Sequence, residues 1–199
     1  PRGHLKSTIV TVGYCLWRIA KNPGIRILIA NATAPLAESF LRQIKNHIQH
    51  NKKFIELYGD LFKGAEKWAD GAIRLAQNVS YEAKENTVVT FGIGGNLVSQ
   101  HYDLMIFDDL VNRDNIHTEE RILEVKNFYK DAQDLVDNPM ETEQVVIGTR
   151  WSEGDLYGDI LDKNNPEFHL WMFMERKAIE GDYQIVKNER GQFEIVGGD

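Results

Sequence analysis

The first residues of the chain contain the groups that a phosphate-binding loop requires. Such a loop combines converging backbone amides, a lysine that reaches the terminal phosphate, a hydroxyl for a magnesium ion and a helix N-terminus that faces the negative charge. Lys6 and Ser7 stand where the pattern GxxxxGK[ST] places its last two residues, and Leu5 replaces the glycine before the lysine. An ordinary helix start capped by Ser7 is the alternative that this segment leaves open.

Two adjacent carboxylates lie far downstream, directly after the apolar run Leu104 to Phe107. A nucleotide-bound magnesium ion needs a carboxylate at the carboxyl end of a buried strand, and Asp108 suits that role. Asp109 suits the orientation or deprotonation of the attacking water. The alternative is a pair of aspartates that merely ends a strand in a turn.

A third polar strand end is predicted at Thr149, because Gln144 to Thr149 is another apolar, strand-like run. In an open α/β sheet, ligands bind beyond the carboxyl ends of the strands, so we expect Lys6, Asp108 and Thr149 to face one crevice. The Thr149 hydroxyl would then sense the terminal phosphate or the attacking water. A local hydrogen bond at the strand end is the alternative role.

Helical and strand patterns alternate along the chain between these groups. Apolar residues three and four positions apart predict helices, and short apolar runs predict buried strands. The predicted helices span residues 7–20, 37–48, 118–136 and 153–163, and the predicted strands span residues 25–30, 87–91, 104–107 and 144–149. Residues 51–86 are polar and predict loops with short helical or strand pieces. The alternation predicts an α/β fold with three layers around a mostly parallel sheet.

The pattern changes after Pro166. Phe168 to Met174 alternate with period two, which predicts a strand, and turn-forming residues around Asn188 to Gly191 predict a β-hairpin near the C-terminus.

The composition excludes several classes of protein. With 199 residues, 42% apolar and 27% charged, the chain suits one globular domain with a substantial core. Its single cysteine, Cys15, predicts a buried thiol in a cytosolic protein. No apolar stretch reaches the roughly 20 residues that cross a bilayer, so we expect no membrane partner. A net charge of -7 leaves room only for a local contact with DNA.

Lysines and tryptophans provide weaker signals. A modest cluster of lysines would either contact DNA phosphates or form a solvated surface, and the sequence favours neither alternative over the other. The tryptophans are predicted to pack in the core rather than to stack on bases. The residues concerned are Lys45, Lys52, Lys53, Lys63 and Lys67, and Trp68, Trp151 and Trp171.

Four segments together resemble the ATPase domain of the large terminase subunit of tailed bacteriophages, the motor that packages genomic DNA. They are Pro1 to Thr8, Ile27 to Ala34, Gly92 to Asp109 and Gly148 to Gly158. That family has a variant P-loop with an arginine near its start, a glycine-rich stretch ahead of paired acids, and a Gly-Thr-Arg-Trp coupling segment, in this order. The similarity spans about residues 1 to 180.

The resemblance implies a P-loop NTPase of the RecA/ASCE-like type that uses ATP and Mg²⁺. By that resemblance Arg2 and Lys6 hold the phosphates. Ser7 and Asp108 hold the metal ion, and Asp109 acts on the water. The implied nucleotide-binding residues are Arg2, Gly3, His4, Leu5, Lys6, Ser7 and Thr8.

The resemblance also implies the domain boundaries. Residues 1–180 would form the ATPase domain, truncated at its N-terminus so that its first strand is missing. An extra strand would lie between that P-loop strand and the strand with the acids. Residues 181–199 would form a β-hairpin or linker toward a nuclease domain that is absent from this chain. The expected activity therefore refers to the full-length protein.

The implied function is ATP hydrolysis that drives viral double-stranded DNA into a procapsid in the host cytoplasm, with Thr149 coupling hydrolysis to movement. The implied partners are double-stranded DNA, the small terminase subunit, the portal protein and further copies of the chain in a ring. Two alternatives stay open. One is a helicase-like DNA translocase with the same phosphate chemistry, and the other is a non-hydrolysing nucleotide-binding assembly module in which Leu5 spoils the loop.

Overall fold

The computed structural model describes residues 5–76, 85–97, 100–136, 142–174, 183–187 and 193–197. Its helical elements are η1 (Ser7–Tyr14), α1 (Cys15–Lys21), α2 (Ala34–His50), α3 (Lys52–Tyr58), η2 (Arg113–Asn115), α4 (Glu119–Gln133), α5 (Leu156–Ile160) and η3 (Phe168–Leu170). Its strands are β1 (Ile27–Asn31), β2 (Lys67–Trp68), β3 (Ala72–Arg74), β4 (Val88–Gly92), β5 (Leu104–Asp108), β6 (Glu143–Ile147), β7 (Tyr183–Lys187) and β8 (Phe193–Gly197).

Six strands form the central sheet, in the order β2-β3-β4-β1-β5-β6. The strands β4, β1, β5 and β6 run parallel to one another, whereas β2 and β3 are antiparallel additions beside β4. Because the four parallel strands point the same way, their last residues, Gly92, Asn31, Asp108 and Ile147, lie along one edge of the sheet. That edge is where ligands bind in open α/β sheets.

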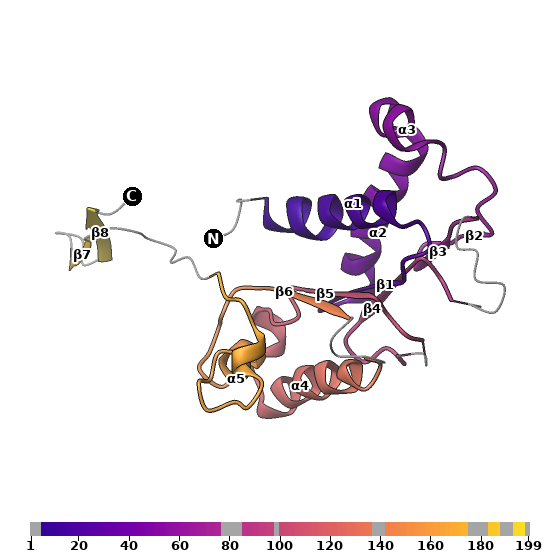
Figure 1. Ribbon diagram of the computed structural model, residues 1–199. Helices are drawn as coiled ribbons and strands as arrows, with labels where there is room; N and C mark the ends of the chain where they lie inside the picture. The colour runs from indigo at the N-terminus through magenta and orange to yellow at the C-terminus, as the bar shows by residue number, and fades with distance from the viewer. Residues whose placement is uncertain are drawn as a thin grey trace.

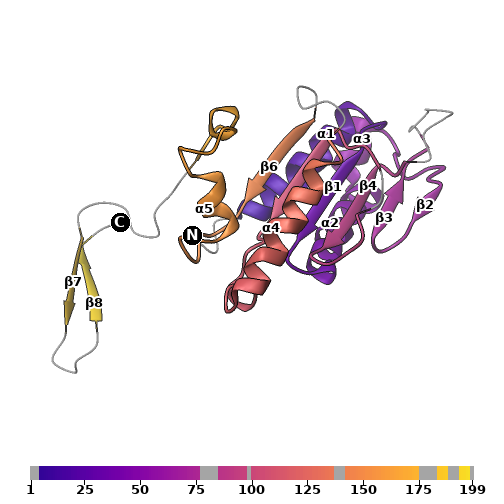
Figure 2. The ribbon, with the colours of Figure 1, turned by 90° about the horizontal axis from the view of Figure 1, so that it is seen from below.

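Helices cover both faces of this sheet (Figures 1 and 2). Alternate residues of a strand point to opposite faces. On β1, Ile27 and Ile29 therefore pack in one core cluster with residues of η1, α1 and α2. Leu28 and Ala30 pack in a second cluster with residues of α4 and α5. The molecule thus has the three layers that the sequence predicts.

Arg26 joins the opposite ends of the three central strands. Its guanidinium lies 2.8 Å from Asp103 Oδ1 and 2.8 Å from Glu85 Oε2, and its backbone N–H donates to Asp103 Oδ2 at 2.9 Å. Arg26, Glu85 and Asp103 each lie shortly before β1, β4 and β5, respectively. The network therefore fixes the start of each strand relative to its neighbours.

A close crossing of backbones requires glycine at position 92. The turn from β1 into α2 passes directly over the end of β4, and a Cβ placed on Gly92 would lie 2.2 Å from the backbone nitrogen of Ala34. No other residue type allows this approach without movement of the backbone. The close approach of the two backbones thus explains why the first residue of the predicted glycine-rich stretch is glycine.

Most of the predicted elements are confirmed, with ends shifted by a few residues. The predicted helix at 7–20 is formed by η1, which has π-helical hydrogen bonding, followed by α1. The thiol of Cys15 is fully buried, as predicted. The strands β7 and β8 pair antiparallel as a separate sheet, which confirms the predicted C-terminal hairpin. The residues of its turn lie outside the described part of the chain.

The predicted strand at residues 168–174 is wrong. Phe168–Leu170 forms a 3₁₀-helix, and the described residues 171–174 are not in a strand. The rings of Phe168 and Phe173 stack on each other at 4.7 Å, while Met172 and Met174 are more than 90% exposed. Alternating hydrophobicity yields a strand only where a neighbour pairs with it and a core covers one face. The described structure has no strand paired with these residues, and Met172 and Met174 do not pack against the core.

β6 is the outermost strand of the described sheet, next to β5. Since β5 is the acid-bearing strand, β6 lies where the extra strand was predicted, between β5 and a P-loop strand on its other side. The P-loop strand itself and the domain boundary at residue 180 stay predictions.

Candidate active site

The structure brings the N-terminal helix to the end of the acid-bearing strand. Ser7 Oγ donates a hydrogen bond to Asp108 Oδ1 at 3.1 Å, and Thr11 Oγ1 donates to Asp108 Oδ2 at 2.5 Å. Ser7 and Asp108 are 101 positions apart in the sequence. The described geometry therefore places the predicted hydroxyl and the first predicted carboxylate in direct contact.

Local periodicity explains this contact. Ser7 and Thr11 are four positions apart on η1, so both hydroxyls lie on one side of the helix. Asp108 follows Leu104 and Ile106 on β5, both of which pack toward η1 and α1, so its carboxylate emerges on that same face of the sheet. Thr11 and Asp108 are fully buried.

Burial raises the pKa of the Asp108 carboxyl above its ordinary value, and the charge of Asp109 adds to this effect. The hydrogen bonds from Thr11 and Ser7 and the charge of Lys6 act in the opposite direction. The carboxyl is thus a buried acid whose oxygens are both directed by hydroxyl donors. That arrangement holds a hard oxygen ligand in a fixed position, which is what a magnesium ion requires.

Lys6 and Leu5 form the turn into the helix. Lys6 Nζ lies 3.5 Å from the carbonyl oxygen of Gly148, a long contact that directs the lysine toward the end of β6. Leu5 has a φ of 54°, in the left-handed region that glycine enters most easily. Leucine thus adopts the backbone conformation that suits glycine at the position where the motif has glycine.

Asp109 leaves the sheet immediately after Asp108. Its φ is 48°, its backbone N–H donates to the carbonyl oxygen of Ile147 at 2.8 Å, and its side chain is exposed. Left-handed backbone at a residue other than glycine costs roughly 1–2 kcal/mol and is found most often at functional sites. The turn gives the two adjacent aspartates different surroundings, one buried and one open to solvent.

Thr149 is exposed at the end of β6, on the same edge of the sheet as Asp108 and Asp109. The preceding Gly148 packs directly against Tyr157, so that a Cβ on Gly148 would lie 2.1 Å from the ring. The Tyr157 hydroxyl donates to the carbonyl oxygen of Ile147 at 3.3 Å. These contacts fix the strand end from which Thr149 extends.

The remaining predicted site residues divide into two groups. Thr8 is exposed on the outer side of η1, away from the Asp108 contact. Arg2, Gly3 and His4 lie outside the described residues, so their predicted roles stay predictions.

Thr11 is the site residue that the sequence reasoning missed. It lies within an apolar helical pattern, where a threonine is read as a tolerated helix residue. The pattern Ser-x-x-x-Thr directly after the lysine was a usable signal, because two hydroxyls at this spacing share one face of a helix.

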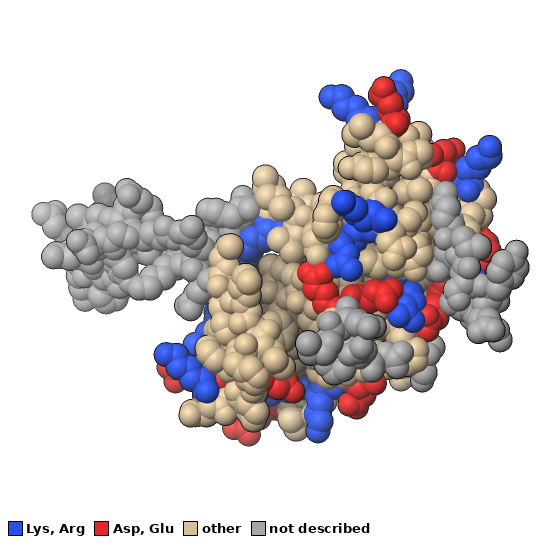
Figure 3. Space-filling model, viewed as in Figure 1, with Lys and Arg blue, Asp and Glu red and all other residues tan. Residues whose placement is uncertain are grey.

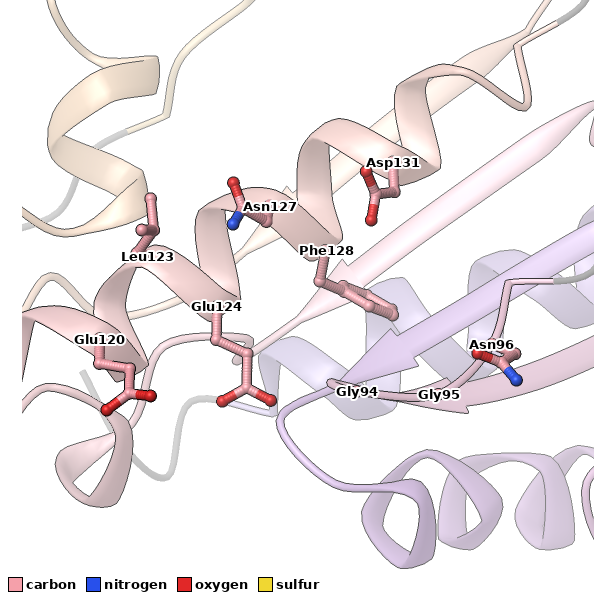
Figure 4. A pocket seen from close by; sticks show the side chains of 9 residues that line it. All are labelled: Gly94, Gly95, Asn96, Glu120, Leu123, Glu124, Asn127, Phe128 and Asp131. Carbon is pink, nitrogen blue, oxygen red and sulfur yellow. The ribbon is translucent and has the colours of Figure 1, made fainter.

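A hollow beside the glycine-rich stretch is not this site. It has a volume of about 570 Å³ and lies between α4 and the turn after β4 (Figure 4). Glu120, Glu124 and Asp131 contribute to its lining, together with Gly94 and Asn96. Three carboxylates make this hollow unsuitable for phosphate groups.

The surface charges do not form a broad basic face in the view of Figure 3, where acidic and basic side chains of the described residues are interspersed. Of the predicted lysine cluster, Lys45 lies over the ring of Trp68 at 5.4 Å and donates to the carbonyl oxygen of Ala69. The three tryptophans pack against the core as predicted, since Trp68 joins one cluster and Trp151 and Trp171 join the other.

A metal ion held by protein groups alone does not suit the described residues, because they contain no group of three or more acidic, histidine or cysteine side chains arranged for one. The Ser7 hydroxyl and the Asp108 carboxylate offer two hard oxygens, which fits a magnesium ion that takes its other ligands from nucleotide phosphates and water. Within the described part of the chain, no helix is both long enough and apolar enough to span a bilayer.

The fold is a three-layer α/β sandwich with a mostly parallel sheet, consistent with the P-loop class. The chain is 24% identical over 182 residues to the large terminase subunit of Enterobacteria phage T3, which confirms the resemblance predicted from the motifs. This match covers 91% of the chain and 30% of the relative, so the chain spans less than a third of that protein.

The N-terminal domain of the DNA packaging ATPase from bacteriophage phi29 superposes with a TM-score of 0.46 at 12% identity, over 79% of this chain and 73% of that one. No protein-family model matches the chain.

Proposed function

We propose that this chain is the ATP-hydrolysing part of a phage DNA-packaging motor. The observation that carries the proposal is the contact of Ser7 and Thr11 with the buried Asp108, at the edge of the sheet where nucleotides bind in this class of fold. The sequence similarity to a large terminase subunit supports DNA packaging as the process.

Each residue has a role that follows from its chemistry. Lys6 contacts the terminal phosphates and neutralises their charge. Ser7 and Asp108 hold the magnesium ion, which supplies further positive charge to the phosphates when it is bound. Asp109, exposed beside them, accepts a proton from the attacking water or orients it. Positioning and charge neutralisation provide most of the catalysis in such a site.

Thr149 completes the proposed site at the end of β6. Its exposed hydroxyl senses the terminal phosphate, and Gly148 and Tyr157 transmit any displacement to α5 through their tight packing. Arg2, Gly3 and His4 complete the nucleotide loop in this proposal. Coupling between hydrolysis and movement would then pass through the end of β6.

The partners and the location are part of the same proposal. The motor acts on double-stranded DNA in the host cytoplasm, in a ring of identical subunits, with a small terminase subunit and a portal protein. Because the chain spans 30% of the terminase relative, we assign these partners to the full-length protein and not to this part alone.

Loss of the phosphate-binding lysine or of the exposed carboxylate tests the ATPase proposal directly. In the full-length protein, Lys6→Ala and Asp109→Asn are each expected to lower kcat by about a hundredfold or more, because they remove charge neutralisation and water activation. A phosphate-release assay with ATP and Mg²⁺ measures the effect.

Matched control variants change the same residue types elsewhere in the chain. Lys52→Ala and Asp70→Asn change exposed residues away from the site and should leave kcat within twofold of the wild-type value. Wild-type turnover in either site variant contradicts the proposal. Calorimetric binding of ATP by the wild-type protein without phosphate release would instead identify a non-hydrolysing module.

A further inference from the structure

Asn31 is a buried polar residue whose side-chain oxygen has no hydrogen-bond partner among the described residues. It is the last residue of β1 and is 3% exposed. A buried amide oxygen without a partner is costly, and native proteins leave few of them. Such an atom marks a place where a water molecule or ligand group belongs.

The strand pattern places Asn31 beside the proposed nucleotide site. Ile27 and Ile29 on β1 pack toward η1 and α1, so Asn31, two residues further on, points to the same face. Asp108 extends from that face on the neighbouring strand β5. The register pairs Ala30 with Phe107, which makes Asn31 and Asp108 the next residues along both strands. Neighbouring strands are about 4.8 Å apart.

Gln144 Oε1 and Ser152 Oγ are also buried atoms without a hydrogen-bond partner, but both belong to half-buried residues. The other fully buried polar side chains of the described residues have partners. Thr87 Oγ1 accepts from the backbone N–H of Leu75 at 3.0 Å, and Thr90 Oγ1 donates to the carbonyl oxygen of Gly71 at 3.1 Å. Asp155 accepts three backbone N–H groups. Asn31 differs from these residues, and it lies at the edge of the sheet that carries Asp108.

We propose that Asn31 is a positioning residue for the ATPase reaction, whose carboxamide accepts a hydrogen bond from a water molecule held beside Asp108. The inference rests on the proposed function. A carboxamide suits this place because it offers an acceptor without adding a third negative charge next to Asp108, Asp109 and the nucleotide phosphates. The residue acts on the reaction through that water and not by contact with the nucleotide.

The decisive variant is Asn31→Leu in the full-length protein. Leucine has a similar size and removes the unpartnered oxygen, so the melting temperature should be unchanged or higher. The kcat for ATP should fall by about tenfold to a hundredfold, whereas KM should stay within threefold. A side chain with only a structural role would not produce this split between stability and kcat.

Further variants keep the inference testable. Asn31→Asp restores an acceptor of the same shape, so its kcat should exceed that of Asn31→Leu, while its added charge should raise KM. If the leucine variant does not fold, Asn31→Ala decides by the same kcat criterion. A wild-type kcat in Asn31→Leu, or in Asn31→Ala if the leucine variant does not fold, overturns the inference.

Thr87→Val serves as the matched control, because it removes a buried hydroxyl that has a partner away from the site. It should lower the melting temperature and leave kcat unchanged. Failure of the inference is distinguishable from failure of the proposed function. An inactive Lys6→Ala variant with a fully active Asn31→Leu variant refutes the role of Asn31 alone, whereas an active Lys6→Ala variant refutes the ATPase assignment.

Discussion

Two hydroxyls from one helix determine how the buried carboxylate of Asp108 is presented. Each oxygen of Asp108 accepts one hydrogen bond, from Ser7 or from Thr11, and the carboxyl group has no exposed surface. A buried carboxylate is tolerated only where such donors compensate for its lost hydration. Ser7 and Thr11 differ in burial, since Ser7 is half-buried and Thr11 is fully buried. In the proposed site, Ser7 is therefore the hydroxyl that reaches a metal ion, and Thr11 is the one that holds Asp108 in place.

Removal of the Thr11 hydroxyl tests this division. Thr11→Val should lower the free energy of unfolding by about 1–3 kcal/mol, because one oxygen of a buried acid loses its donor. It should also lower kcat, since Asp108 gains freedom to turn. Urea unfolding and a phosphate-release assay measure the two effects. Thr8→Val, on the exposed side of the same helix, is the control for stability and should leave the free energy of unfolding unchanged. An equal loss of stability in both variants would show that the helix and not the hydrogen bond is responsible.

Leu5 is strained where glycine would be relaxed. Its left-handed backbone costs roughly 1–2 kcal/mol for a residue with a Cβ, and its side chain is 64% exposed, so little packing compensates. Leu5→Gly is therefore expected to leave stability unchanged or to raise it by up to about 1 kcal/mol, and to preserve ATP turnover. Thermal unfolding checks the first expectation. A clear loss of stability would mean that the leucine side chain stabilises the loop by contacts outside the described residues.

The strands β1 and β5 have different kinds of residue at their two ends. Arg26 connects the starts of β1, β4 and β5, whereas Asn31, Asp108 and Thr149 lie at or just after the carboxyl ends. The ion pairs set the stagger of the strands, and the stagger sets how close Asn31 and Asp108 lie. Stability and site geometry are thus coupled along β1 and β5, the two strands that have both an Arg26 contact and a residue of the proposed site.

The Arg26 network should make stability depend on pH in acid. Burial alone raises the pKa values of Asp103 and Glu85, but the hydrogen bonds from Arg26 outweigh it and lower both pKa values. Each carboxyl group therefore stabilises the fold at pH values above its pKa in the unfolded chain, which is about 4. This stabilisation is lost as the pH falls through the lower pKa of the folded state.

Arg26→Met should therefore lower the free energy of unfolding by about 1–2 kcal/mol at pH 7 and flatten its decline below about pH 4. Urea unfolding at pH 7, 4 and 3 measures the slope. Lys126→Met breaks a more exposed ion pair with Asp159 and provides the control, with a smaller loss and no change in the acid slope. An unchanged slope in Arg26→Met would contradict the assigned cause of the pKa shifts.

At the scale of the whole molecule, the elements with a buried face were predictable from sequence and the contact-dependent details were not. The runs in β1 and β5 are apolar throughout because helices cover both sides of the sheet. The strands β2 and β3 have two and three residues, too few to show a period. Residues 168–174 have a strand-like pattern without a neighbour to pair with.

The candidate site shows the same division. Lys6, Ser7 and the paired aspartates were recognisable because their chemistry appears in adjacent residues. Thr11 and Asn31 were not, since a threonine in a helix and an asparagine before a turn have common local explanations. The roles proposed for them depend on the register of β1 against β5 and on the face of η1 that meets the sheet, which only the folded chain provides.

β6 has a consequence for handling the protein. Its outer edge is paired with no strand of the described sheet, and such an edge offers free backbone donors and acceptors to another chain. Glu143 is the one charged residue in β6, and its carboxylate already contacts Tyr14 and Arg18. It therefore offers little charge repulsion against a second chain that pairs with this edge. Wherever no further strand covers β6, concentrated samples will aggregate edge to edge, and turnover is measured reliably only below the concentration at which light scattering begins to rise.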